Sequence, residues 1–161
     1  MLLLAVVLVG GIATAASDEA GSPVDQYRVL DWTDLVPEGW EPALVAKAYD
    51  DEAANDVDEA AVVKDLDQQL AALPGYMKPV VYNGNEVSEF LLVPYLPHQI
   101  TAHAHLDPNQ MVYVYSHEPI IVEDLYQPIW VVGAISTESV MTDEGPAAYR
   151  MVEAVTTEYE Y

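Results

Sequence analysis

Cysteine is absent from all 161 residues, so neither a disulfide framework nor a cysteine nucleophile is available. Basic side chains are scarce as well: five Lys and Arg stand against 27 Asp and Glu, a formal charge of −22. Phosphate backbones and anionic membranes would be repelled by such a surface. The shortage of basic side chains excludes nucleic acid as an expected partner. Without disulfides, the stability of the fold must come from packing, with or without a bound ion.

A long hydrophobic run is also missing, since a transmembrane helix needs roughly 20 apolar residues. The most apolar segment is residues 1–16, MLLLAVVLVGGIATAA, which has no ionised side chain and ends in small residues. This pattern predicts a signal peptide that is cleaved after Ala15 or Ala16. We therefore expect a periplasmic or secreted protein without a transmembrane anchor after cleavage.

The acidic excess lies entirely in the part of the chain that follows the signal segment. One interpretation is adaptation to a salty medium, in which ions screen the self-repulsion. The other is recognition of a cation or a basic partner. The densest acidic run, DDEAANDVDE at residues 50–59, lacks the Gly and terminal Glu spacing of a calcium-binding loop and reads as a solvated linker.

Residues 17–60 are predicted to form an acidic N-terminal arm and linker with helical or irregular structure. Trp32 and Trp40 lie in a Pro- and Gly-punctuated segment, which indicates a hydrophobic anchor packed on a core. An aromatic sugar-binding platform is the alternative. Asp31 or Thr33 is suited to cap a short helical turn in the same segment.

Residues 61–161 are predicted to form a β-barrel domain. Strand-like runs cover residues 76–82, 86–94, 111–115, 127–140 and 148–157. Asn83-Gly84 is a hairpin turn signal, and Gly133 indicates a bulge. Short strands joined by turns, without a βαβ rhythm, favour a mainly β fold: a small antiparallel five-stranded OB-like barrel. Residues 57–73 are ambiguous, because their Ala, Leu, Glu and Gln content favours a helix.

Catalysis finds little support in the residues. Ser88, Ser116 and Ser136 lie in no nucleophile-elbow context, and no Gly-rich phosphate loop occurs. An enzyme is the least favoured class.

Three of the four histidines, His98, His103 and His105, fall within eight residues. His103 and His105 are two apart, so an extended chain places both rings on one side. Zinc or copper suits such imidazole ligands, and His117 is a possible fourth. The alternative is a polar loop or strand edge that holds no ligand.

Five segments together resemble the domain of unknown function 3299 family of exported bacterial proteins. They are DWTDLVP at 31–37, LPGYMKPV at 73–80, EFLLVPY at 89–95, PNQMVYV at 108–114 and PIWVVGAI at 128–135. The resemblance implies a turn and then a strand ahead of the Pro-Gly-Tyr segment, so it favours strand over helix for residues 69–76. It implies no activity, because none is established for the family.

In one segment this sequence departs from the pattern of the family that it resembles. Between the Val-Pro-Tyr and Pro-Asn-Gln motifs the family usually has a Cys, a nearby His and several prolines, whereas this segment has histidines and no Cys. The resemblance therefore raises the hypothesis that histidines replace a Cys and His pair at an existing site.

Four residues of the next motif are candidates for ligand binding. Asn109 and Gln110 are expected to hold the turn before the following strand through side-chain to backbone bonds, with ligand contact as the alternative. Tyr113 and Tyr115 share one face of that strand and are suited to line a groove, although half-exposed strand tyrosines are common.

These patterns favour an exported, noncatalytic OB-like binding or accessory module that contacts a protein or a small ligand in the cell envelope. The alternative is a periplasmic zinc- or copper-binding protein that uses the histidine-rich loop.

Overall fold

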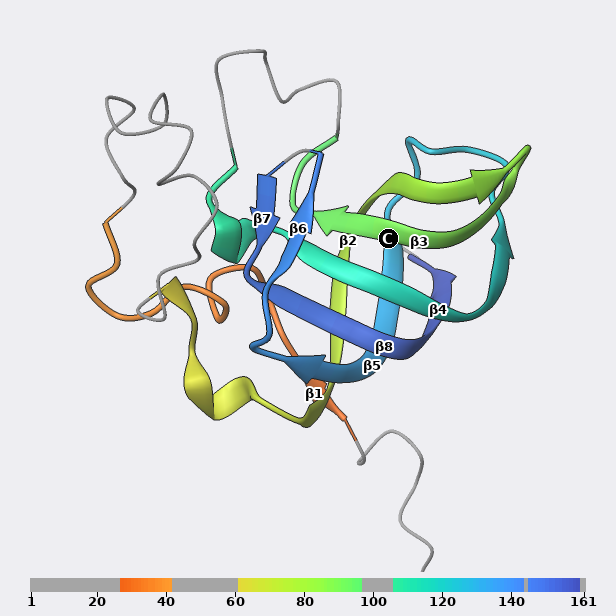
Figure 1. Cartoon of the computed structure of the whole chain (residues 1–161). Helices are drawn as coiled ribbons and strands as arrows, with labels where there is room; N and C mark the ends of the chain where they lie inside the picture. Colours follow the sequence, from red (N-terminus) through yellow and green to blue (C-terminus); the bar gives the residue numbers. More distant parts are fainter. Residues whose placement is uncertain (1–26, 42–60, 97–105, 144, 160–161) are drawn as a thin grey trace, which may run out of the picture.

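The computed structural model describes residues 27–41, 61–96, 106–143 and 145–159 (Figure 1). Several predictions lie outside these residues: the signal peptide at 1–16, the acidic run at 50–59 and the histidines His98, His103 and His105.

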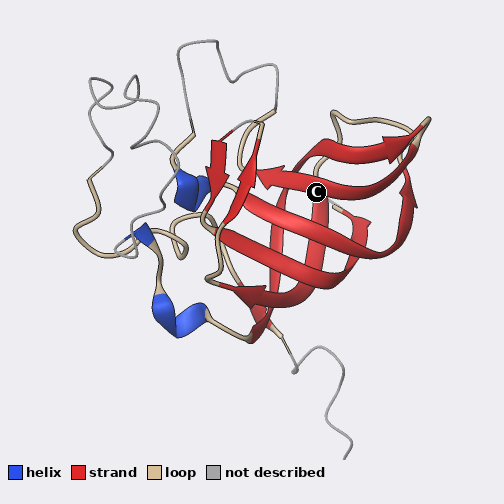
Figure 2. Cartoon of the chain, viewed as in Figure 1, coloured by secondary structure: helices blue, strands red, loops and turns tan. Residues whose placement is uncertain are grey.

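The described chain is mainly β (Figure 2). Its strands are β1 Arg28–Val29, β2 Gln69–Asn83, β3 Glu86–Val93, β4 Val112–Ile121, β5 Ile129–Ser136, β6 Val140–Thr142, β7 Gly145–Ala147 and β8 Tyr149–Glu158. Two short 3-10 helices, η4 Lys64–Leu66 and η6 Pro108–Gln110, precede β2 and β4. Within the described ranges, no helix is long and apolar enough to cross a membrane.

Five strands close into a barrel in the order β2-β3-β4-β8-β5, with β5 pairing back to β2. Counted along the chain, this is first-second-third-fifth-fourth, a Greek-key arrangement of the OB-like kind that the sequence predicts. β1 adds two residues in parallel to β2. The mainly β barrel is confirmed, but the expectation that it is wholly antiparallel is wrong, because β4 and β8 run parallel. An odd number of strands cannot alternate direction all the way around a closed ring.

Closure depends on the length of β2. Its first half pairs with β5 up to Gly75, and its second half pairs with β3 from Tyr76 onward. At this crossing a Cβ on Gly75 would lie 2.8 Å from the Val93 carbonyl oxygen, so the close approach requires glycine. Pairing on both sides overrides the local helix propensity. The strand prediction for residues 69–76 is therefore confirmed.

Two predicted glycine features are confirmed. β2 ends at Asn83 and β3 begins at Glu86, and Gly84 in the connecting turn has a φ of +65°. A left-handed backbone of this kind suits a tight hairpin. Gly133 lies where the register of β5 and β8 shifts between Val132 and Ala134, which is the bulge that its sequence position indicates.

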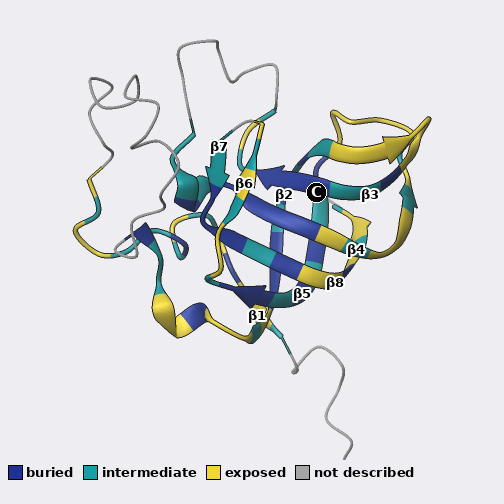
Figure 3. Cartoon of the chain, viewed as in Figure 1, coloured by how far each residue is buried: buried dark blue, intermediate teal, exposed yellow. Residues whose placement is uncertain are grey.

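The barrel interior is filled by side chains from every barrel strand and from the N-terminal arm. Figure 3 colours the buried stretches of these strands dark blue. Leu30 and Leu35 of the arm are buried with this core, and Trp32 packs against it. The Trp32 Nε1–H donates to the Pro74 carbonyl over 2.7 Å. Trp32 is therefore the hydrophobic anchor predicted for the arm.

Tyr149 connects the core to two other segments. Its hydroxyl donates to the Leu35 carbonyl over 2.8 Å and accepts from the Val63 N–H over 2.7 Å. Its side chain is fully buried, and burial raises the pKa of the phenol. The hydroxyl therefore stays protonated and ties the arm and the η4 segment to β8.

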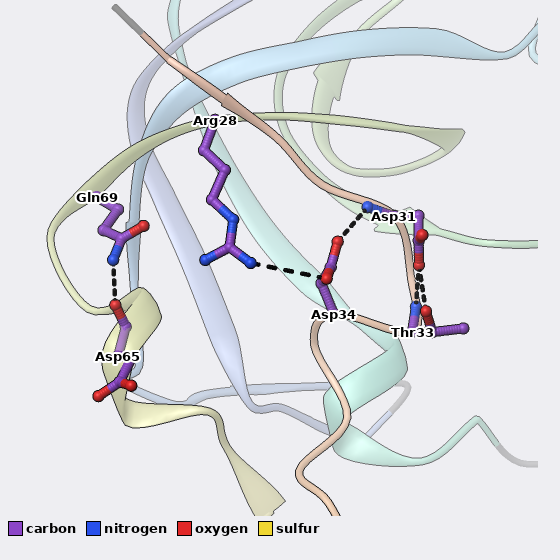
Figure 4. A network of polar contacts seen from close by, with 6 residues as sticks. All are labelled: Arg28, Asp31, Thr33, Asp34, Asp65 and Gln69. Carbon is purple, nitrogen blue, oxygen red and sulfur yellow. Dashed lines mark hydrogen bonds and ion pairs between the residues drawn. The ribbon is translucent and has the colours of Figure 1, made fainter.

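A polar network shapes the arm just outside the core (Figure 4). Asp31 Oδ1 accepts from the Thr33 N–H over 2.7 Å and from the Thr33 hydroxyl, and this side-chain bond lowers the pKa of Asp31. Asp34 Oδ2 accepts from the Asp31 N–H over 2.9 Å, and Arg28 forms a 3.7 Å ion pair with Asp34. Asp31 is thus the capping residue of the predicted turn.

Candidate functional site

The outer wall of the barrel carries a second apolar cluster. It contains Leu91, Val93, Met111, Tyr113 and Ala147 and is separate from the interior core. Val140 of β6 packs against it, and Ala147 belongs to β7. Figure 1 shows the β6–β7 hairpin beside the end of β3. Within the described part of the chain, this hairpin therefore covers one part of the outer face.

The register of the strands defines two rows on this face. One row runs Lys78, Leu91, Tyr113 and Arg150 across β2, β3, β4 and β8. The next row runs Val81, Glu89 and Tyr115 across β2, β3 and β4. Val152 lies two residues after Arg150 on β8 and so shares the outer face. We call Val81, Glu89, Tyr115 and Val152 the Glu89 row.

Three residues of the Glu89 row are exposed, whereas the two central residues of the neighbouring row are buried. Val81 is 45% exposed, Tyr115 38% and Val152 39%, whereas Leu91 is 0% and Tyr113 6% exposed. The β6–β7 hairpin packs on the buried row. The Glu89 row is therefore an accessible part of the outer face.

Two tyrosines and one carboxylate meet between the rows. The Tyr113 hydroxyl donates to Glu89 Oε2 over 2.5 Å, and the rings of Tyr113 and Tyr115 lie 5.0 Å apart at an interplanar angle of 54°. Burial, with the bond to Glu89, raises the pKa of Tyr113 well above its usual value. Tyr113 therefore remains a proton donor and holds the Glu89 carboxylate in place. We call these three residues the Glu89 corner.

The structure thus brings together two predicted residues, Tyr113 and Tyr115, and adds a third that sequence reasoning missed. Glu89 belongs to the EFLLVPY motif, and its alternation with Leu91 and Val93 places it on their face of β3. Its position opposite Tyr115 depends on the β3–β4 register, which pairs segments that lie on either side of the histidine-rich stretch in the sequence.

His117 continues the outer face of β4 and pairs with Glu153 of β8. The His117 Nδ1 atom lies 2.6 Å from Glu153 Oε2, and both side chains are largely exposed. The hydrogen bond to Glu153, followed by its charge, raises the pKa of His117. Glu153 adopts a φ of +52° near the register shift between β4 and β8. The fourth histidine therefore has a carboxylate partner of its own.

Asn109 and Gln110 lie on η6, immediately before β4. The Gln110 Nε2 amide donates over 3.2 Å to the carbonyls of Asn109 and Trp32, so it joins the turn to the N-terminal arm. Asn109 is 1% exposed, and its Nδ2 has no hydrogen-bond partner among the residues that the structure describes. Gln110 makes the side-chain to backbone bonds expected of the motif, while ligand contact by either residue stays a prediction.

A metal site is not found in the described part of the chain. Among those residues, no group of three or more His, Cys, Asp or Glu side chains is placed to hold an ion. The predicted ligands His98, His103 and His105 lie outside it. The zinc or copper site therefore stays a prediction.

The serines considered as nucleophiles bond to backbone groups. Ser88 Oγ donates to the Val81 carbonyl, Ser116 Oγ donates to the Glu118 carbonyl, and Ser136 Oγ accepts from the Glu138 N–H.

Together the barrel and its tyrosine-bearing outer face define a small OB-like β-barrel protein. A family model described as "Protein of unknown function (DUF3299)" matches residues 32–158. The chain belongs to this family, as the sequence motifs indicate. It is similar to the crystal structure of a DUF3299 family protein from Pseudomonas aeruginosa PAO1, with 35% identity and a TM-score of 0.64 over 84% of this chain and 97% of that one. No curated protein matches the chain.

Proposed function

We propose that this protein is an exported, noncatalytic OB-like binding module whose ligand lies on the Glu89 row. OB-fold proteins often bind ligands on the outer face of their second and third strands, which correspond to β3 and β4 here. The observation that carries the proposal is the exposure of Val81, Tyr115 and Val152 around one carboxylate on this face. Aromatic and aliphatic side chains left uncovered beside a polar group are typical of binding surfaces.

The charge of the chain favours a positively charged ligand. A formal charge of −22 attracts cations and basic proteins and repels anionic ones. The outer face carries Glu89 and Glu153 beside its exposed apolar groups, with Lys78 and Arg150 in the neighbouring row. A protein or small ligand of the cell envelope with basic groups fits this surface best.

The proposal that the protein is exported rests on residues 1–16, which have the composition of a signal peptide. Expression of the full chain in a bacterial host, followed by mass measurement of the periplasmic and secreted fractions, tests it directly. A product that begins at Ala16 or Ser17 supports export. An uncleaved product confined to the cytoplasm contradicts it.

Binding is tested by titrating the labelled protein with muropeptides, oligosaccharides, and basic and acidic peptides while recording amide chemical shifts. We expect at least one of these compounds to bind and to shift the amide resonances of the Glu89 row. Tyr115→Ala and Val152→Ser should weaken its binding, because they remove exposed contact area. Val155→Ser is the matched control, since Val155 is a 62% exposed valine of the same strand outside the row. Binding that maps to another surface, or no binding by any class, contradicts the proposal.

Metal binding is a second candidate function, favoured by three histidines within eight residues. Calorimetric titration of the metal-stripped protein with zinc and copper tests it. A real site gives sub-micromolar binding that a His103→Ala/His105→Ala double variant abolishes. His117→Ala, tested in the same way, shows whether the possible fourth ligand, which pairs with Glu153, contributes to that binding. Equal weak binding by wild type and the double variant rules the site out.

A further inference from the structure

We propose that the β6–β7 hairpin is a displaceable lid, and that the apolar patch beneath it binds small aliphatic side chains of an extended partner segment. The inference rests on the proposed function, because it extends the same outer face by a second subsite. It is carried by the position of a small, separate hairpin on an apolar patch that adjoins the exposed Glu89 row. We call the following residues the covered patch: Leu91, Val93, Met111 and Tyr113.

The covered patch lies outside the barrel, although its side chains are as buried as those of the core. Leu91 and Leu92 are neighbours on β3, and both are 0% exposed. Leu92 belongs to the interior cluster and Leu91 to the outer one, because successive side chains of a strand point to opposite faces. Barrel closure buries Leu92. Leu91 is buried instead by what packs on the outside, which includes Val140 and Ala147 of the hairpin.

The hairpin is a small element of its own. β6 and β7 form a separate two-stranded sheet with three residue pairs, from Val140 and Ala147 to Thr142 and Gly145. Met141 is 50% exposed, so the side of β6 that carries it is turned to solvent. A two-stranded hairpin is marginally stable by itself, and a segment with few buried apolar contacts opens at a lower free energy than the whole domain. We therefore expect the hairpin to open while the barrel stays closed.

Both ends of the connection that carries the hairpin are fixed to other segments. Before β6, the Thr137 N–H donates to Asp67 Oδ1 over 3.0 Å. After β7, the Ala148 N–H donates to the Pro108 carbonyl over 2.8 Å. Because these bonds hold the two ends, β6 and β7 can move away from the patch without separating the barrel strands β5 and β8.

Tyr113 joins the covered patch to the Glu89 row. Leu91 lies opposite Tyr113, and Glu89 lies opposite Tyr115, two residues further along each strand. The Tyr113 ring belongs to the outer apolar cluster, while its hydroxyl donates to Glu89. Displacement of the hairpin would therefore leave one continuous surface from the covered patch to the Glu89 corner.

The hairpin itself indicates which side chains the patch accepts. Val140 and Ala147 are small and aliphatic, they come from paired strands, and they pack in the outer cluster. A partner polypeptide that presents such side chains from an extended segment fits the same patch. The formal charge of −22 adds a preference for basic residues on either side of that segment.

Cysteine labelling tests the lid, because the chain has no cysteine of its own. Leu91→Cys places a thiol in the covered patch. Leu92→Cys is the matched control, since it makes the same substitution one residue further along the strand, in the barrel core. Under native conditions a thiol reagent should label Leu91→Cys at least about tenfold faster than Leu92→Cys, because the hairpin opens more often than the barrel unfolds. Urea unfolding of each variant corrects the two rates for any difference in global stability.

Variants of the hairpin show whether its movement exposes the patch. Val140→Ser removes the apolar side chain that packs on the outer cluster and should speed the labelling of Leu91→Cys several-fold. Met141→Ser is the matched control, because it changes the exposed neighbouring residue and should alter the rate less than about twofold. Labelling of Leu92→Cys should be unaffected by either change.

Fluorescence anisotropy with a labelled peptide tests the subsite. The probe is a peptide of alternating valine and alanine with a lysine at each end, and its control has serine in place of each valine. We expect the valine peptide to bind more tightly than the serine peptide of the same charge. Val140→Ser should strengthen its binding several-fold, because the open state is more populated, whereas Met141→Ser should change it less than about twofold.

Three results would overturn the inference: labelling of Leu91→Cys no faster than that of Leu92→Cys, equal effects of Val140→Ser and Met141→Ser on labelling, or a valine peptide that Val140→Ser binds no more tightly than wild type. The first two would make the hairpin a fixed part of the outer wall, and the third would mean that the uncovered patch is no binding site. The proposed function survives all three if Tyr115→Ala and Val152→Ser still weaken the ligand that maps to the Glu89 row. It fails separately if no ligand maps there.

Discussion

The two faces of β3 and β4 differ in what covers them. On the inner face Phe90, Leu92 and Val114 are fully buried in the barrel core. On the outer face Leu91 is buried under the β6–β7 hairpin, while Tyr115 stays 38% exposed. Barrel closure seals the inner face completely, whereas the outer face is sealed only where a second element packs on it. The uncovered remainder is where a ligand has room.

The largest effect is expected on the inner face. Phe90→Ala should lower the free energy of unfolding by about 3–5 kcal/mol, because it leaves a cavity in a closed core. Urea unfolding measures the loss. The outer-face counterpart Tyr115→Ala should cost less than about 1 kcal/mol, since the ring is partly exposed. Similar losses for the two variants would contradict the difference in burial between the two faces.

Leu91→Ala tests the covered part of the outer face. Leu91 is 0% exposed beneath the β6–β7 hairpin, so its truncation should cost about 2–5 kcal/mol, as in a true core. The control is Val152→Ala on the uncovered part, with an expected loss below about 1 kcal/mol. Chemical denaturation of both variants is the measurement. A loss below about 1 kcal/mol at Leu91 would mean that the hairpin does not seal this row.

Tyrosine hydroxyls on the two faces should also differ. Tyr149→Phe leaves the Leu35 carbonyl and the Val63 N–H without their buried partner and should cost about 1–3 kcal/mol. Tyr113→Phe removes one bond to Glu89 and should cost about 0.5–1.5 kcal/mol. Thermal and urea unfolding measure both losses. A larger loss at Tyr113 than at Tyr149 would contradict the assignment of Tyr149 as the polar link to the arm.

The smallest effect concerns the exposed pair His117 and Glu153. Because the pair raises the pKa of His117, its stabilisation is present below the unfolded value of about 6.5 and is lost as pH rises through the higher folded value. NMR titration should give a raised pKa in wild type and a value near 6.5 in Glu153→Gln. Glu118→Gln is the control with a smaller shift, because Glu118 acts only through its charge. A wild-type pKa at or below 6.5 would contradict the pairing.

Local patterns predicted much of this architecture. The alternation in β3 and β4, the glycine at the β2–β3 turn and the bulge at Gly133 are each confirmed, because each depends on residues adjacent in the chain. The shared face of Tyr113 and Tyr115 follows from the two-residue period of a strand and is confirmed by their ring contact. Residues 57–73 were ambiguous by composition, and the family motifs favoured strand for residues 69–76, which lie in β2.

Other features depend on contacts between distant segments. The sequence by itself determined strand content, turn positions and which side chains share a face. Only the tertiary structure decided that β4 and β8 run parallel, that Glu89 meets Tyr113 and Tyr115, and that His117 pairs with Glu153. The physical reason is that register and strand direction are set by closing one barrel around one core, and no local propensity encodes that closure.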